Sequence, residues 1–394
     1  MEYRLEELFD LQMGKTPSRS VTEYWESGNN KWISIADLSK CGKYIYDTKE
    51  CLSDIAVSES GIKQIPANTV VMSFKLSIGK TAITSEPMYS NEAIMSFRDR
   101  KLVQLLPEYI YYLLLSKNWD DGTNKAVMGK TLNKATLSKV KVNIHSMQEQ
   151  QEIVYVLNQA TALIELHQQQ LQKLDELVKA RFVEMFGDPV GNTKAYYVAT
   201  LQELICKGYI TYHLDGNHGG DYPKSDEFVE AGIPYISANC IVNGEVDFSK
   251  AKYLTLERAN KLRKGIAQNG DVLFAHNATV GPTVVLHTTK EKVILGTSLT
   301  AYRCNKEKIL PSYLKTYMLS DGFIRQYSNE MKQTTRNQVP ITAQKKYLFL
   351  IPPIGLQNQF ATFVNQVDKS KVAVQKSLDE AQLLFDSLMQ QYFD

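Results

Sequence analysis

The stretch that decides the fold is residues 148–187, QEQQEIVYVLNQATALIELHQQQLQKLDELVKARFVEMFG, which holds no proline and no glycine before its last residue. Its seam positions recur at alternating spacings of four and three, which is typical of a coiled coil rather than of the broader face of a globular helix. The seam consists of Ile153, Leu157, Ala160, Ile164, His167, Leu171, Leu174, Val178, Arg181 and Met185. A single helix with so long a seam needs a partner helix.

The same chain supplies that partner at residues 357–393, QNQFATFVNQVDKSKVAVQKSLDEAQLLFDSLMQQYF. Phe360 lies 207 positions after Ile153, and the same offset relates every other pair of seam residues. The second seam consists of Phe360, Val364, Val367, Lys371, Val374, Leu378, Ala381, Phe385, Leu388 and Tyr392. The residues that we expect to join the helices or to bind other subunits are Leu157, Ile164, Leu171, Leu174, Val178, Phe360, Val367, Leu378, Phe385 and Leu388.

The repeat continues upstream of both helices. WISIADLS at 32–39 faces PYISANCI at 234–241 with an offset of 202, which pairs Asp37 with Asn239. LPEYIYYLLLS at 106–116 faces LPSYLKTYMLS at 310–320 with an offset of 204. Because the order of matching blocks never changes, the chain is a duplication of one unit.

Each unit predicts an α+β fold. Short β-rich runs such as TVVMSF (69–74) and DVLFA (271–275) indicate an irregular sheet. A short helix at 108–117 or 312–319 follows, then a long loop, and then the long helix. The predicted division is a first domain at 1–146, a central helix at 147–189, a second domain at 190–350 and a C-terminal helix at 351–394.

The two long helices are expected to pack antiparallel, because the first must return the chain to a second globular unit at its far end. This predicts two similar domains at opposite ends of a rod, related by a pseudo-twofold axis. Gly187 and Pro189 are expected to end the first helix, since glycine adopts the left-handed cap and proline cannot continue a helix. The alternative is that each helix only caps its own domain.

Composition excludes several classes of protein. The net charge of +2 is too small for the protein as a whole to attract nucleic acid, so any basic surface must be local. The 5 cysteines are far apart and form no C-x-x-C pair, which argues against disulfides or a zinc site and for a reducing compartment. The sequence shows no signal peptide and no long apolar run, so we expect a cytoplasmic protein without a membrane span.

No catalytic constellation stands out. Three Gly-Lys-Thr tripeptides, at 14–16, 79–81 and 129–131, lack the upstream glycine of a phosphate-binding loop. The string DPVG at 188–191 matches only half of the motif that holds the target base in adenine methyltransferases. The 6 histidines have no metal-ligand spacing. We therefore expect neither enzymatic activity nor a metal or cofactor bound by this chain.

Two basic loops are the strongest functional signal. Residues 122–148 and 331–367 contain no acidic residue but several Lys and Arg, at the same place in both repeats. One such run usually marks a solvated face, but its repetition favours DNA binding, because Lys and Arg with Thr, Asn and Gln grip phosphates and read base edges. The glycine-containing loops MGKTPS (13–18) and DGNHGG (215–220) either approach a ligand closely or are plain turns. The candidate DNA contacts are Lys15, Ser34, Asp37, Lys75, Lys80, Lys130, Thr131, Lys134, His218, Asn239, Asn277, Thr279, Lys332, Thr335, Arg336 and Asn337.

Several strings together resemble the specificity subunits of type I restriction–modification systems. These strings are GKTPS at 14–18, YW at 24–25, WISIADL at 32–38, GKTLN at 129–133, EQQ at 149–151 and LDELVKARFVEMFGDP at 174–189. The last string is specific to the family, and the likeness covers essentially the whole chain. The sequence departs from the family pattern at Ile144, His145 and Ser146, where a Pro-Pro pair like Pro352–Pro353 is usual, so the direction in which the central helix starts is less defined.

The resemblance implies a non-catalytic subunit in which each of two target-recognition domains reads one half of a bipartite, asymmetric site on double-stranded DNA. The helical rod would set the spacer and bind two methyltransferase subunits. Those subunits would use S-adenosylmethionine to methylate adenine, and restriction and translocase subunits would use ATP and Mg²⁺. Two alternatives stay open: a specificity component whose partner fuses methyltransferase and nuclease, and a coiled-coil scaffold that does not bind DNA.

Overall fold

The protein folds into two compact units, and each contains chain segments that are far apart in the sequence. Unit 1 comprises Met1–Gln168 and Lys376–Asp394, and unit 2 comprises Gln169–Gln375. The computed structural model describes residues 1–26, 28–75, 77–119, 124–126, 129–188, 191–217, 219–331 and 337–394, with the backbone alone at 124–126, 129–131, 220 and 329–330. The unit boundaries fall inside the long helices α6 (Met147–Phe186) and α12 (Ile354–Phe393), so each unit holds half of each helix.

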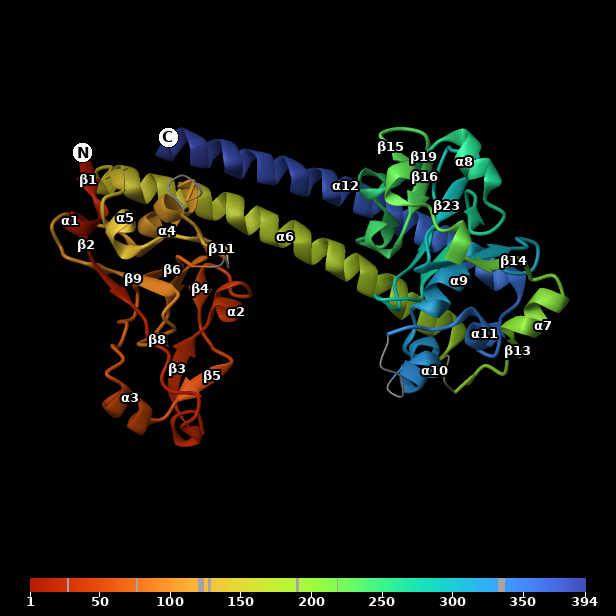
Figure 1. The fold of residues 1–394 in the computed structure, drawn as a ribbon, viewed down its shortest axis with the longest axis horizontal. Coiled ribbons are helices and arrows are strands. Elements are labelled where there is room, and N and C mark those ends of the chain that lie inside the picture. Colours follow the sequence, from red (N-terminus) through yellow and green to blue (C-terminus); the bar gives the residue numbers. More distant parts are fainter. Residues whose placement is uncertain are drawn as a thin grey trace. The chain divides into compact units, whose positions relative to one another are not determined.

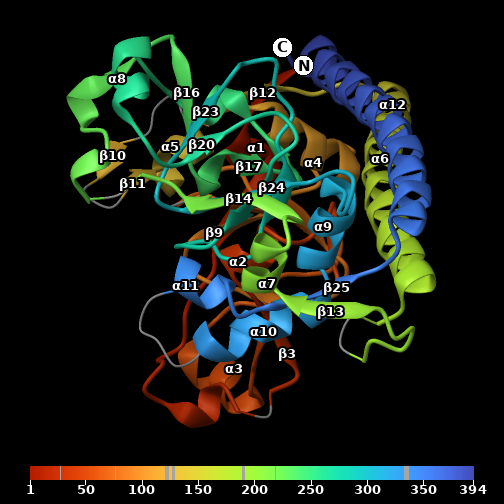
Figure 2. The same cartoon turned by 90° about the vertical axis from the view of Figure 1, so that its right-hand side faces the viewer.

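The two long helices lie side by side and run antiparallel within each unit (Figures 1 and 2). In unit 1, Leu157 near the start of α6 belongs to the same core as Met389 near the end of α12. In unit 2, the ring of Phe182 near the end of α6 lies 5.5 Å from that of Phe360 near the start of α12. The predicted helix pairing is confirmed, and the alternative in which each helix covers only its own domain is wrong.

The two helices begin in different ways. Ser146 and Glu149 form a capping box on α6: the Ser146 backbone N–H and hydroxyl both donate to the Glu149 carboxylate, at 2.8 and 2.7 Å. These hydrogen bonds lower the pKa of Glu149. The second helix begins directly after Pro352 and Pro353. At the far end of α6, Gly187 has φ of +78° and its N–H donates to the Val183 carbonyl at 2.8 Å, which confirms the predicted left-handed cap.

In the described part of unit 1, β2, β9, β6, β7 and β4 form a five-stranded sheet in that order, and β5, β3 and β8 form a three-stranded one. Strand β1 pairs with β12, and β10 pairs with β11. The strands are β1 (Glu2–Arg4), β2 (Phe9–Met13), β3 (Asn30–Ile33), β4 (Tyr44–Ile45), β5 (Glu50–Leu52), β6 (Val70–Ser73), β7 (Thr81–Thr84), β8 (Tyr89–Ser90), β9 (Ile94–Asp99), β10 (Asn124–Ala126), β11 (Gly129–Thr131) and β12 (Lys141–Asn143). The shorter helices are α1 (Leu5–Leu8), η1 (Thr22–Tyr24), α2 (Ile35–Leu38), α3 (Asp54–Ser60), α4 (Pro107–Ser116) and α5 (Lys134–Ser138).

In the described part of unit 2, β14, β24, β21 and β22 form a four-stranded sheet, and β15, β19, β16, β23 and β20 form a five-stranded one. Strand β13 pairs with β25, and β17 pairs with β18. The strands are β13 (Tyr197–Thr200), β14 (Ile210–Asp215), β15 (Phe228–Val229), β16 (Ile233–Ile236), β17 (Ile241–Val242), β18 (Glu245–Val246), β19 (Lys252–Leu254), β20 (Ile266–Ala267), β21 (Val272–Ala275), β22 (Thr283–Val285), β23 (Val293–Leu295), β24 (Leu299–Cys304) and β25 (Leu348–Ile351). The shorter helices are α7 (Leu201–Cys206), η2 (Gly219–Asp221), η3 (Ser225–Glu227), η4 (Ala238–Cys240), η5 (Phe248–Lys250), α8 (Leu256–Lys261), α9 (Pro311–Met318), α10 (Asp321–Met331) and α11 (Ile341–Gln344).

The central strands are apolar because both faces of their sheet are covered. On β6, Val70 and Met72 belong to the core shared with the helix pair, whereas Val71 between them belongs to a core on the opposite face. On β21, Phe274 and Leu273 divide in the same way. Successive side chains of a strand point to opposite faces, so each of these strands stabilises two cores.

The predicted short helices are confirmed as α4 and α9, and each has proline at its first position, where the missing N–H costs nothing. The long loop predicted after α9 is wrong, because the eleven-residue helix α10 occupies its start. Phe323 and Tyr327, four residues apart, are 0% and 3% exposed on one face of α10. Spacing by four buries both rings on one side of a helix, a signal present in the sequence.

The strand pairing also corrects the repeat register around Asp37. Trp32 pairs with Tyr89 on β8, and Tyr235 pairs with Ile294 on the equivalent strand β23, so Trp32 matches Tyr235 with an offset of 203. Ser34 then corresponds to Ser237, and both precede a short helix. The sequence itself carries this offset, since Ile33 and Ser34 then match the identical pair Ile236 and Ser237.

Candidate nucleic-acid interface

In unit 1, the structure brings the chain segments that carry two groups of predicted DNA contacts together. The turn between β6 and β7 carries Lys75 and Lys80, and Lys80 is exposed. At its base, the N–H of Leu132 donates to the carbonyl of Phe74 at 3.0 Å, which ties this turn to the chain following β11. The hairpin β10–β11 therefore adjoins the turn through its backbone, with Lys130 in its second strand. The side chains of Lys130 and Thr131 lie outside the described residues.

Helix α5 starts directly after this hairpin. Asn133 caps it by accepting a hydrogen bond from the N–H of Thr136 at 2.7 Å. Lys134, the first residue of the helix, is exposed. The exposed side chains of Lys80 and Lys134 can approach an anionic backbone.

Unit 2 repeats this construction with different side chains. The turn between β21 and β22 carries Asn277 and Thr279, and the N–H of Val339 donates to the carbonyl of His276 at 2.8 Å. The N–H of Ala278 donates to the Asn337 carbonyl at 3.0 Å, and Asn277 forms an antiparallel bridge with Gln338. Three predicted contacts, Asn277, Thr279 and Asn337, are thus brought together. The predicted contacts Lys332, Thr335, Arg336 and His218 lie outside the described residues.

Other predicted contacts have internal partners. Ser34 and Asp37 form the capping box of α2: the Ser34 N–H and hydroxyl donate to the Asp37 carboxylate at 2.9 and 2.7 Å. The ammonium of Lys15 donates to the Ser60 carbonyl at 2.5 Å. Asn239 is exposed on η4. Their role in DNA binding stays a prediction.

In both glycine-containing loops, glycine allows a close contact with another segment of the same protein. A Cβ added at Gly14 would lie 2.2 Å from the carbonyl oxygens of Ser90 and Asn91, and one at Gly216 would lie 1.8 Å from that of Gly296. At both sites the chain hydrogen-bonds to a neighbouring strand: Lys15 N–H to Ser90 and Asn217 N–H to Leu295. The close approach that glycine permits at these two positions is therefore to the protein's own backbone.

Sequence reasoning missed a buried glutamine at the start of each long helix. In unit 1, Gln150 accepts from the N–H of Leu106 at 3.1 Å and donates to two carbonyls. In unit 2, Gln357, 207 positions later, accepts from the N–H of Leu310 at 2.9 Å and also donates to two carbonyls. The signal was available, since glutamine recurs at the repeat offset three residues before the first seam residue of each helix, Ile153 and Phe360.

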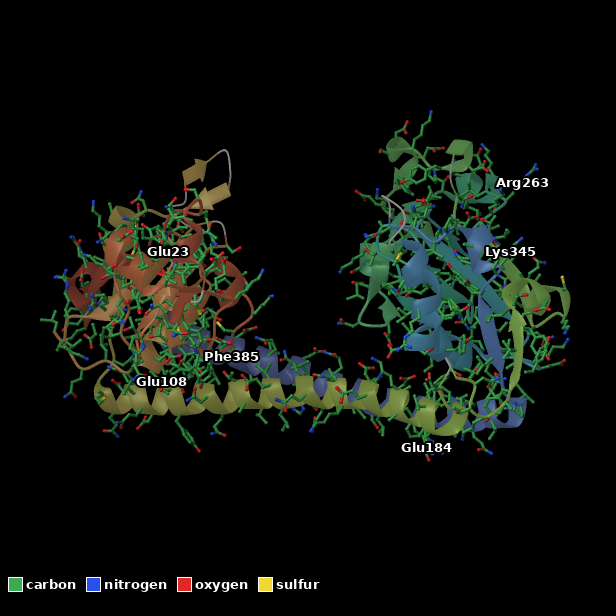
Figure 3. The ribbon with its side chains drawn as sticks, turned by 90° about the horizontal axis from the view of Figure 1, so that it is seen from below. Glu23, Glu108, Glu184, Arg263, Lys345 and Phe385 are labelled. Atoms are coloured by element: carbon green, nitrogen blue, oxygen red, sulfur yellow. The ribbon has the colours of Figure 1, made fainter. Side chains whose placement is uncertain are left out.

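The predicted seam residues are buried or half-buried. Leu157 and Phe360 are 0% exposed and Val367 is 5% exposed. The half-buried members are Ile164, Leu171, Leu174, Val178, Leu378, Phe385 and Leu388. The ring of Phe385 lies 6.2 Å from that of Tyr112 on α4, and Figure 3 shows Phe385 and Glu108 where this helix meets the pair.

Apolar residues also remain exposed beside the seam. Leu177 is 47% exposed on α6, and Leu384, 207 positions later on α12, is 50% exposed. Other exposed apolar residues on the pair are Tyr155, Leu163, Leu166, Val183, Val372 and Leu383. Such a surface on a helix pair is typical of a binding site for another protein.

Residues 1–176 and 213–381 match the protein family described as "Type I restriction modification DNA specificity domain". The chain belongs to this family of type I specificity subunits. The specificity subunit of the type I restriction enzyme MjaIX from Methanocaldococcus jannaschii is 22% identical over 398 residues, covering 98% of this chain and 90% of that protein.

Two solved structures share the fold of this specificity subunit. The S subunit of a type I restriction–modification system from M. genitalium superposes with a TM-score of 0.54 at 14% identity, covering 100% of this chain and 96% of the other. A chain from a study of complex assembly and conformational transition of the type I system gives 0.57 at 15% identity, covering 99% and 96%. As a member of this family the chain supplies DNA specificity to a type I restriction enzyme and is not its catalytic subunit.

Neither a membrane span nor a metal site is found among the described residues. None of their helices combines the length and the apolar character that crossing a bilayer requires. Nor do three or more His, Cys, Asp or Glu side chains in this part of the chain gather as metal ligands would.

Proposed function

We propose that each unit reads one half of a bipartite, asymmetric site on double-stranded DNA, while the helix pair sets the spacing and docks two methyltransferase subunits. Residues 1–146 and 190–350 would be the recognition domains, with 147–189 and 351–394 as the helices between them. The observation that carries the proposal is the repeated loop base: Leu132 on Phe74 in unit 1 and Val339 on His276 in unit 2. One construction with different side chains suits two different half-sites.

The partners follow from the same proposal. The exposed apolar residues of α6 and α12, together with polar Gln168, Gln169, Gln172 and Glu176 beside them, are the surface for the methyltransferase subunits. These subunits would hold S-adenosylmethionine and methylate adenine. Restriction and translocase subunits would join through the complex and use ATP and Mg²⁺ for cleavage.

Mapping methylated adenines in a genome, with and without this gene, tests the proposal directly. We expect a two-part sequence motif that disappears with the gene. If the motif does not change, the proposed function is wrong. The purified chain with its methyltransferase should also bind DNA with an affinity that falls steeply with salt, because phosphate contacts release counterions.

Lysine substitutions test which unit reads which half. Lys130→Ala with Lys134→Ala should weaken binding at one half-site, and Lys332→Ala with Arg336→Ala should weaken it at the other. An equal loss on unrelated DNA sequences would show that these residues only grip phosphates.

Inserting one heptad into each long helix tests the spacing role. A heptad adds about 10 Å at 1.5 Å per residue, so we expect a longer preferred spacer with both half-sites unchanged. An unaltered spacer would contradict the role of the helices as a ruler.

A further inference from the structure

A buried polar network in unit 2 lies next to residues 337–339 and the turn that carries Asn277 and Thr279. Its centre is Gln344 at the end of α11, which is 0% exposed. The Gln344 amide group donates to the Val339 carbonyl at 3.1 Å and to the Thr300 hydroxyl at 3.1 Å. Its oxygen accepts from the Tyr302 hydroxyl at 2.6 Å and faces Nε2 of His213 at 3.1 Å. The Thr300 hydroxyl lies 2.9 Å from Nδ1 of His276.

The direction of these hydrogen bonds is fixed by one carbonyl. Because the Val339 oxygen can only accept, the Gln344 nitrogen must face it, and the Gln344 oxygen must face His213. His213 is therefore protonated at Nε2. The Nδ1 atom of His213 has no hydrogen-bond partner among the described residues.

The network is connected to Val339 through both backbone groups of that residue. Gln344 holds the carbonyl of Val339, and the N–H of Val339 donates to His276, where the turn that carries Asn277 and Thr279 begins. Residues 337–339 are thus fixed by directional bonds on both sides. Figure 3 labels the neighbouring Lys345 in unit 2.

Unit 1 has an apolar side chain at every equivalent position. Leu11 pairs with Phe97 across β2 and β9 as His213 pairs with Tyr302 across β14 and β24. Met95 pairs with Met72 as Thr300 pairs with Phe274. Phe74 matches His276, since each accepts from the chain after the loop, and five residues further along Leu137 matches Gln344. All of these unit 1 side chains are at most 3% exposed and share one core.

The difference between the two units distinguishes what the fold requires from what positions residues 337–339. An apolar core suffices at this place in unit 1, so the fold itself does not need the network. A buried polar group costs stability unless every hydrogen bond is made, whereas apolar contacts tolerate small shifts. The directional hydrogen bonds of Gln344 therefore restrict residues 337–339 to one position more strictly than apolar packing does, although Nδ1 of His213 has no partner among the described residues.

We propose that Gln344, with His213, His276 and Thr300, is a positioning network that sets the placement of residues 337–339 and of the adjoining turn at Asn277 and Thr279, and thereby the sequence preference of unit 2. This inference rests on the proposed function, because it assumes that unit 2 reads one half-site. It assigns no base contact to Gln344 itself.

The test replaces the wild-type chain with the variant Gln344→Leu, which has leucine at this position as unit 1 does at Leu137. The matched control is Gln357→Leu. Gln357 is also 0% exposed in unit 2, but its side chain bonds the backbone of Leu310, Lys308 and Pro352 and none of the network residues. Methylated adenines are mapped for both variants. Gln344→Leu should reduce base discrimination in one half of the motif by roughly ten-fold, while the other half stays unchanged.

A merely structural role would lower methylation without altering the motif, as expected for Gln357→Leu. If Gln344→Leu keeps the wild-type motif or relaxes both halves equally, the inference is wrong. If the wild-type gene itself directs no methylation, the proposed function fails first, and the two failures are distinguishable.

Hydrogen exchange supplies a readout that does not depend on DNA. In the purified chain the amide of Val339, which donates to His276, should exchange at least ten-fold faster in Gln344→Leu than in Gln357→Leu. Equal exchange rates would overturn the positioning role.

A second variant guards against misfolding. The combination His213→Leu, His276→Phe, Thr300→Met, Tyr302→Phe and Gln344→Leu gives unit 2 the apolar side chains of unit 1. This combination removes every polar side chain of the network, so none of them is left without its partner. The variant should fold and direct methylation, with a changed or relaxed base preference in one half-site. An unchanged motif would show that the network does not set specificity.

Discussion

The two units hold the long helices with equivalent residues of different kinds. In unit 2, the rings of Phe182, Phe186 and Phe360 lie 5.0 to 5.5 Å from one another, and Tyr313 packs on Phe186 at 4.9 Å. In unit 1, Ile153 and Met389 stand where unit 2 has Phe360 and Phe182. Duplication preserved the places where the helices attach, while the side chains at those places diverged.

The largest expected effect concerns this aromatic cluster. Phe360→Ala should lower the free energy of unfolding of unit 2 by about 3–5 kcal/mol, because a fully buried ring leaves a cavity. Ile153→Ala should cost unit 1 less, since it loses fewer atoms and no ring pairs. Calorimetry of the two transitions measures both, with Phe360→Ile as the control that copies unit 1. A larger loss from Ile153→Ala would break the comparison.

The buried glutamines should behave alike in the two units. Gln150→Leu and Gln357→Leu each leave one backbone N–H and two carbonyls without a side-chain partner. Each substitution should cost its own unit about 2–4 kcal/mol, given the penalty for unsatisfied buried groups. Unequal costs, measured by denaturation, would mean that the two helix starts are not equivalent.

Acid should destabilise unit 2 through His213. Burial lowers the pKa of His213 to about 4 from an ordinary 6.5; Lys345 and His276 also lower it, whereas Gln344 and Asp215 oppose the shift. The folded state therefore favours the neutral ring, and this stability is present above pH 6.5 and is lost as the pH falls towards 4. A shift of this size corresponds to about 3 kcal/mol.

The comparison with unit 1 supplies the control, because Leu11 occupies the equivalent position there. His213→Leu should remove this part of the pH dependence of unit 2 and leave unit 1 unaffected. Calorimetry at several pH values measures it. A pH dependence that survives the substitution would assign the effect to another group.

The smallest effect is expected from an ion pair that unit 1 lacks. Lys371 on α12 pairs with Asp175 on α6 in unit 2. Because the Asp175 side chain is 63% exposed, Lys371→Ala should cost only about 0.2–1 kcal/mol, and less in high salt. In unit 1 the equivalent residue is Ile164, 207 positions before Lys371. The loss of unfolding free energy in Ile164→Ala should therefore not depend on salt. If the loss of unfolding free energy in Lys371→Ala does not depend on salt, the aliphatic part of the lysine side chain stabilises unit 2 by packing instead of by the ion pair.

The sequence was sufficient for the helix pair, the duplication and the short helices, because these depend on periodicity and on proline. Helix α10 was missed even though Phe323 and Tyr327 show helical spacing. At the candidate interface, the two basic loops were predictable from charge. The His213–Gln344 network was not, because its members are far apart in sequence and only strand pairing brings them together.

The division of each long helix between the units has a consequence for biosynthesis. Lys117, the residue after α4, donates to the carbonyl of Phe393 at 3.2 Å, a contact between residues 276 positions apart. The first unit therefore cannot close its core while the ribosome is still making unit 2, and part of its apolar surface waits for α12. A nascent chain in that state would be a substrate for chaperones, which bind exposed apolar segments of incompletely folded proteins.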